Sequence, residues 1–109
     1  MDVISLETLG TELLAKARDA RAGRAARTVH GGEEHSLRQT AIALTGGTAL
    51  GEHESPGEAT LQVLSGRVSL HAGGETQALA AGEWLSIPPE RHDLEAHEDS
   101  VVLLTVSLT

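Results

Sequence analysis

The chain has 109 residues, which is enough for one domain with a single core but not for two. It has no Cys, one aromatic residue, Trp84, and a net charge of −8. This composition excludes disulfides, thiolate metal sites and an aromatic platform for stacking bases or sugars.

The charge is distributed unevenly along the chain. Residues 1–29 contain four acidic and five basic side chains, whereas residues 30–109 contain twelve acidic and three basic ones. An acidic body repels a phosphate backbone, so we expect no nucleic-acid partner and interpret the early basic residues as a solvated helix face. No apolar run reaches the length of a membrane span, and the N-terminus is amphipathic rather than continuously apolar. We therefore expect a cytoplasmic protein with no membrane partner.

The first predicted element is an amphipathic helix over residues 5–22. Its apolar positions follow the i, i+3, i+4, i+7 spacing: Leu6, Leu9, Leu13, Leu14 and Ala17. Ser5 is the expected N-cap and Gly23 the expected C′ residue. The leucine stripe must pack against something, either the outside of a sheet or a partner subunit. We assign residues 1–29 to this helix and a connector, and residues 30–109 to a β domain.

The chain beyond Gly31 has the character of a β protein. Ten of the twelve glycines lie from Gly31 onward, between short segments rich in Leu, Val, Thr and Ser. The predicted strands are 36–44, 59–64, 67–72, 77–80, 84–87, 92–96 and 101–108. Short strands with glycine turns at this spacing are typical of an all-β antiparallel sandwich or barrel. The last strand begins Val-Val-Leu-Leu, so we expect it to be covered on both faces.

Residues 47–66 carry the most informative pattern. They read GTALGEHESPGEATLQVLSG, with a Pro-Gly turn at Pro56 that leads into an apolar strand. The segment resembles the first signature of the cupin superfamily, G-x5-H-x-H-x3,4-E-x6-G. The first glycine, first histidine and last glycine positions are filled by Gly47, His53 and Gly66. The second histidine position is Ser55 and the glutamate position is Ala59.

A second match follows at residues 82–92, which read GEWLSIPPERH. It resembles the opening of the second cupin signature, G-x5-P-x-G-x2-H-x3-N, with Gly82 and Pro88 in place. The signature glycine after Pro88 is absent, His92 comes one residue early, and no Asn occupies the last position. The resemblance covers about residues 40–106. It implies a cupin-type antiparallel β-sandwich or jelly-roll barrel with one N-terminal α-helix outside it.

The resemblance also bears on metal binding. In cupins with the full pattern, the signature histidines and glutamate hold a divalent metal, and only His53 and His92 remain here. Catalytic metals normally take three protein ligands, so two imidazoles are too few. Three nearby carboxylates are candidates for recruitment: Glu52, Glu54 and Glu58. Strand alternation points them away from the signature positions, so we expect no cofactor. The alternative is a Zn, Fe, Ni or Mn site with a recruited ligand.

The candidate ligand-binding residues are His53, Ser55, His92, Arg38 and Gln39. We expect His53 and His92 to approach each other at one open end of the barrel, although 39 positions separate them in the sequence. Their imidazoles can donate and accept hydrogen bonds to a small ligand. Arg38 and Gln39 are polar residues in an otherwise apolar segment, and could hold a carboxylate or carbonyl. The alternation does not decide whether they face the pocket or the solvent.

Outward-facing apolar residues predict a homodimer. Leu64 and Trp84 alternate away from the inward-facing residues of their strands, and the helix stripe adds further apolar surface. Large exposed apolar patches are uncommon on monomers, and most soluble homo-oligomers are twofold dimers. The resemblance implies the same, because related cupins commonly dimerise through a sheet face.

Three functions are compatible with the sequence. The first is a binding module for a small molecule, with a pocket that is metal-free or binds metal weakly. The second is a metal-dependent enzyme of the isomerase, lyase or oxygenase type that uses His53, His92 and a recruited ligand. The third is a structural or interaction dimer without a ligand. The sequence identifies neither the ligand nor a reaction, because one scaffold hosts many activities.

Overall fold

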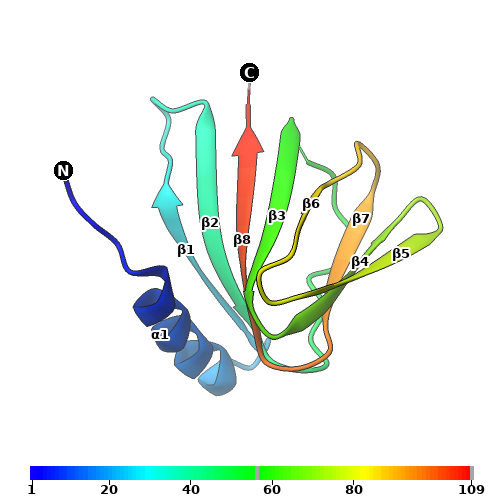
Figure 1. Cartoon of the computed structure of the whole chain (residues 1–109), viewed down its shortest axis with the longest axis horizontal. Coiled ribbons are helices and arrows are strands. Elements are labelled where there is room, and N and C mark those ends of the chain that lie inside the picture. The colour runs from blue at the N-terminus through cyan, green and yellow to red at the C-terminus, as the bar shows by residue number, and fades with distance from the viewer. Residues whose placement is uncertain (56, 109) are drawn as a thin grey trace.

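The computed structural model of the chain describes residues 1–55 and 57–108 (Figure 1). Within these residues there are one helix and eight strands: α1 (Leu6–Asp19), β1 (Arg24–His30), β2 (Leu37–Leu44), β3 (Glu58–Ser65), β4 (Arg67–Ala72), β5 (Glu75–Ala80), β6 (Trp84–Ser86), β7 (His92–Ala96) and β8 (Ser100–Ser107). The turn predicted at Pro56 lies outside the described residues. No helix in the described part of the chain is long and apolar enough to cross a membrane.

The strands form two antiparallel sheets. The larger sheet has the order β1-β2-β8-β3-β6, and the smaller one has the order β5-β4-β7. Figure 1 shows α1 beside the β1 end of the larger sheet and the smaller sheet at its other end, around β6. The predicted all-β antiparallel sandwich with one N-terminal helix is therefore confirmed.

All seven predicted strands are present, and each boundary lies within two residues of the prediction. One strand was missed, because β1 forms where the sequence predicted a connector over residues 24–29. Its sequence, RAARTVH, has no clear alternation, and most of its side chains are exposed. Backbone pairing with β2 holds this edge strand, with a register shift between Thr28 and His30. When backbone pairing holds a strand and most of its side chains are exposed, the side chains need not alternate between apolar and polar types. Such a strand is difficult to predict from its sequence.

The inner core lies between the two sheets. It consists of inward-facing aliphatic side chains from both sheets: Leu44, Ala59, Leu61, Val63, Val68, Leu70, Leu79, Ile87, Leu94, Ala96 and Val102. Alternation along each strand places these residues on one face. Val102 of β8 is fully buried in this core.

A second, outer core lies between α1 and the larger sheet. Its buried members are Leu9, Leu13, Ala17, Ala41, Ala43 and Val101. Val101 and Val102 thus belong to different cores, which confirms the prediction that β8 is covered on both faces. Ser5 caps α1 as predicted, because its Oγ accepts a hydrogen bond of 3.2 Å from the Thr8 N–H. Gly23 does not serve as the C′ residue, since the helix ends at Asp19 with Ala20 as its C-cap.

Candidate functional site

His53 and His92 lie side by side, as the sequence predicted. They form an isolated antiparallel bridge, in which the N–H of each donates to the carbonyl of the other at 2.9 and 3.0 Å. Their ring centroids are 4.4 Å apart, and the ring planes meet at 67°. His92 begins β7, while His53 lies in the long connection between β2 and β3. The fold therefore unites the two histidines that survive from the two signatures.

The ring protons of both histidines are fixed by the backbone. Nδ1 of His53 lies 2.9 Å from the Gly51 carbonyl oxygen, and Nδ1 of His92 lies 2.8 Å from the Glu90 carbonyl oxygen. A carbonyl oxygen can only accept, so each Nδ1 must carry the proton. In the neutral ring, Nε2 is then an acceptor with a free lone pair. Among the described residues, neither Nε2 has a hydrogen-bond partner.

A small cavity lies behind the two rings. Its volume is about 20 Å³, which is room for about one water molecule. Apart from the two histidines, its wall is aliphatic: Ile42, Leu50, Leu61, Leu70, Ile87, Leu94 and Leu104. His92 is only 3% exposed, whereas His53 is exposed at the mouth. A ligand larger than water can therefore place only its head group inside.

The segment that carries His53 is tied to β7 at several points. The N–H of Gly51 donates to Oδ1 of Asp93 at 2.8 Å, and the N–H of Leu50 donates to the Leu94 carbonyl at 3.0 Å. Glu52 and Arg91, the sequence neighbours of the two histidines, also form an ion pair of 3.4 Å. This pair is well exposed, so it contributes less than about 1 kcal/mol, and the backbone bonds do most of the positioning.

The site does not fit a divalent metal. The three glutamates considered as recruited ligands are all exposed, and none of them lines the cavity: Glu52, Glu54 and Glu58. No group of three or more His, Cys, Asp or Glu residues that could hold a metal ion occurs in the described part of the chain. Two imidazoles against an aliphatic wall are one ligand short of the usual catalytic metal site.

The other candidate residues lie away from the histidine pair. Arg38 is on the inner-facing side of β2, in line with Ile42, but it is exposed and does not line the cavity. Gln39 faces the opposite side, where its Nε2 donates to Thr105 Oγ1 at 3.2 Å. Ser55 is half-buried and does not line the cavity either. The structure thus brings together only two of the five predicted residues.

The four remaining histidines lie on outer surfaces. Those of the smaller sheet have polar partners, which sequence analysis did not identify: Ser69 Oγ lies 2.6 Å from His97 Nε2, and His71 Nδ1 lies 2.8 Å from Thr76 Oγ1. Alternation along β4 places His71 on the face opposite to Val68 and Leu70, and this is the signal that the sequence offers. His30 and His35 stack at 4.6 Å beside the connection between β1 and β2. Their partners satisfy or shield these rings, so the pair at the cavity remains the better site.

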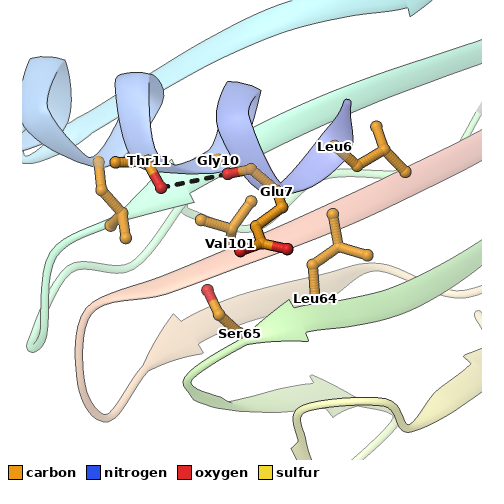
Figure 2. Close-up of a pocket in the computed structure, with 8 residues that line it drawn as sticks. Leu6, Glu7, Gly10, Thr11, Leu64, Ser65 and Val101 are labelled. Carbon is orange, nitrogen blue, oxygen red and sulfur yellow. Dashed lines mark hydrogen bonds between the residues drawn. The ribbon is translucent and has the colours of Figure 1, made fainter. Parts of the chain in front are cut away.

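A larger hollow than the histidine cavity contains no histidine. It is a groove of about 350 Å³ on the outer face, bounded by α1 on one side and by β3 and β8 on the other (Figure 2). Its lining is mostly apolar, with one charged residue: Leu6, Glu7, Gly10, Thr11, Leu14, Leu64, Ser65 and Val101. The candidate ligand site is therefore not chosen by its volume. It is chosen by the two fixed histidine nitrogens, which lie at the smaller cavity and not in this groove.

Comparison with known proteins decides the family. The sequence profile of the cupin domain family matches residues 41–107. The chain belongs to the cupin domain family. The resemblance found in the two signatures is therefore confirmed, and of the four metal-binding positions in those signatures this cupin keeps two histidines.

Solved structures agree with this assignment. A conserved protein of unknown function from Streptococcus pyogenes is 30% identical, with a TM-score of 0.74 over 83% of this chain and 78% of that one. A cupin superfamily protein from Desulfitobacterium hafniense is 13% identical, with a TM-score of 0.72 over 79% and 78% of the two chains. The search of curated proteins found no match.

One similar structure is an enzyme. A variant of salicylate 1,2-dioxygenase from Pseudoaminobacter salicylatoxidans is 22% identical, with a TM-score of 0.77. The match covers 95% of this cupin but only 34% of the dioxygenase. At this identity the likeness shows the fold alone. Similar structures thus include both an enzyme and proteins of unknown function.

Proposed function

We propose that this cupin is a binding module that takes a small molecule at the His53–His92 pair without a bound metal. The observation that supports it most is the pair of unpartnered Nε2 atoms, each held in place by a backbone carbonyl behind its own ring. Atoms fixed in this way can orient a ligand at little cost in conformational entropy. The described residues supply no third metal ligand.

The experiment has two parts. Elemental analysis of the purified protein should give much less than one divalent metal per chain. Protein treated with a chelator should still bind members of a small-molecule fragment library, detected by saturable shifts of the His53 and His92 ring signals in NMR. A His53→Asn variant should lose these shifts, while His35→Asn, at an exposed histidine that does not line the cavity, should keep them.

A metal-dependent enzyme is the competing function. Stoichiometric zinc, iron, nickel or manganese that is lost in His53→Asn would contradict the metal-free proposal. The likeness to the dioxygenase does not favour this alternative, because it extends to the fold only.

We also propose that the cupin is a homodimer through the outer face of its larger sheet. Trp84 is 59% exposed and pairs with Gln62 of β3, so its side chain lies on the same face as Leu64. The groove beside Leu64 is on that face too. A twofold partner could cover both features at once, since an isologous interface repeats each contact. Light scattering should give about twice the 11.4 kDa of one chain. A mass near that of one chain would refute the dimer.

Two further expectations from the sequence, the absence of a nucleic-acid partner and a cytoplasmic location, remain proposals. The acidic body, with net charge −8, supports the absence of a nucleic-acid partner. A cytoplasmic location remains a prediction from the sequence.

A further inference from the structure

The two unpartnered nitrogens define what kind of group the site accepts. Each Nδ1 donates to a carbonyl oxygen, so each ring in its neutral form offers a ligand an acceptor, and no donor, at Nε2. His92 is 97% buried, since only 3% of it is exposed. Among the described residues, no fully buried side-chain nitrogen or oxygen lacks a partner. The unpartnered Nε2 of His92 is therefore not fully buried.

The matching ligand group must supply hydrogen atoms. A carboxylate or carbonyl offers only lone pairs, which would face the two lone pairs of the rings. A hydroxyl offers one donor, and a primary ammonium offers three. The rings are close enough, at 4.4 Å between centroids, for one small group to contact both.

The charge of the chain favours a cation over an anion. Four carboxylates lie within two residues of one or the other histidine in the sequence, although none of them lines the cavity: Glu52, Glu54, Glu90 and Asp93. The one basic residue among these neighbours, Arg91, is paired with Glu52. With a net charge of −8, the chain as a whole attracts an ammonium group and repels a carboxylate.

We infer that the ligand of this site presents a hydrogen-bond donor, and best a primary ammonium group, to Nε2 of both His53 and His92. The inference rests on the proposed function, because it names the ligand class for the same pair. The cavity of about 20 Å³ admits only the donor group, so the rest of the ligand lies outside the mouth.

The experiment uses four small probes that separate donor from charge. Ethylammonium has both, ethanol has a donor without charge, tetramethylammonium has charge without a donor, and acetate is an anion with acceptors only. Nitrogen-15 NMR of the full chain reports the protonation of each ring nitrogen and its response to each probe. We expect both rings to carry the proton on Nδ1, and ethylammonium to shift both Nε2 signals saturably. Tetramethylammonium should bind at least about tenfold more weakly, and acetate should cause no saturable shift.

A matched pair of variants tests the geometry. The side-chain amide of His53→Asn can still donate to the Gly51 carbonyl, but it removes the Nε2 acceptor. This change should weaken ethylammonium binding about tenfold or more. His35→Asn makes the same replacement at an exposed histidine outside the site and should leave the affinity unchanged.

The outcomes separate this inference from the proposed function. Two outcomes would overturn the inference that the ligand presents a donor: saturable binding of acetate without binding of ethylammonium or ethanol, and protons on Nε2 in both rings. Either outcome would leave the proposal of a metal-free binding site intact. If ethanol binds as tightly as ethylammonium, the requirement for a hydrogen-bond donor is supported but the preference for an ammonium group is refuted. Absence of any shift with all four probes overturns the inference, while the fragment screen decides the function independently. Tight zinc binding that His53→Asn abolishes refutes both.

Discussion

The inner histidine cavity of this cupin and the outer groove beside α1 differ in both size and chemistry. The inner cavity holds about 20 Å³ and presents two histidine nitrogens with no partner among the described residues. The outer groove holds about 350 Å³, but its wall is mostly apolar with Glu7 as its one charged residue. Polar atoms in fixed positions give a ligand site its specificity, whereas an exposed apolar surface is stabilised by any partner that covers it. The smaller hollow is therefore the better ligand site, and the larger one the better interface.

The difference has a structural origin. Branched aliphatic side chains from both sheets meet inside the sandwich and fill it almost completely. On the outer face, α1 packs over β1, β2 and β8, so the surface near β3 and β6 is left without a helix (Figure 1).

The largest expected effect comes from opening the inner cavity. Leu94 is 3% exposed and lines it, so Leu94→Ala should lower the free energy of unfolding by about 2–5 kcal/mol. Urea unfolding measures this loss. Leu37→Ala, at a leucine that is 45% exposed, should cost less than about 1 kcal/mol. A loss below about 1 kcal/mol in Leu94→Ala would mean that the interior is not closely packed.

The second prediction concerns the two metal ligands that the inner cavity lacks. Ala59 belongs to the inner core, so Ala59→Glu directs a carboxylate inward, and Ser55→His adds an imidazole two residues after His53. Together they should raise zinc affinity by about 100-fold or more, measured by calorimetry. A control with Ser55→His and Thr60→Glu directs the carboxylate to the outer face and should not show this gain. Equal gains in both would show that the barrel does not position these ligands.

The third prediction concerns the outer face. If the homodimer forms there, Trp84→Lys should raise its dissociation constant by about 30-fold, because buried aromatic residues dominate interfaces. Light scattering over a dilution series measures the change. Thr76→Lys adds the same charge on an exposed residue of the smaller sheet that does not share a hollow with Trp84, and serves as the control. A dimer that is unaffected by Trp84→Lys would place the interface elsewhere.

The smallest effect is expected at the link between α1 and the turn before β8. The N–H of Gly46 donates to Asp99 Oδ1 at 3.0 Å, and Arg18 Nε donates to Oδ2 at 2.9 Å. These two hydrogen bonds, the backbone one first, lower the pKa of Asp99 from its ordinary value of 3.8. The two hydrogen bonds therefore contribute fully to the free energy of unfolding above pH 3.8. This contribution is lost as the pH falls through the lower pKa that Asp99 has in the folded protein.

Melting temperatures measured between about pH 6 and pH 2 test this link. Asp99→Asn should lower the melting temperature slightly at neutral pH and remove part of its fall in acid. Glu98→Gln alters an exposed carboxylate that lies 3.9 Å from Arg67, and should change the profile less. An Asp99→Asn profile parallel to that of the unaltered chain would contradict the assignment.

The sequence alone determined the fold and the family. Alternation in the strands placed Leu64 and Trp84 on the outer face, because successive side chains of a strand point to opposite faces. The spacing of Gly47, His53 and Gly66 identified the first signature. Gly66 shows why that spacing is informative: its φ is +84°, and a Cβ there would contact the backbone and hydroxyl of Ser100. A local requirement of this kind is visible in the sequence itself.

Only the tertiary structure decided the chemistry of the site. The proton position on each ring depends on a carbonyl two residues before the histidine, which the loop conformation brings within 2.9 Å. The size of the cavity depends on how side chains from both sheets meet, and strand β1 depends on backbone pairing with β2. Gln39 faces away from the cavity because of the register between β2 and β8. The cavity, strand β1 and the orientation of Gln39 arise from contacts between distant parts of the chain, and the ring contacts arise from loop conformations; the pattern of residue types encodes none of them.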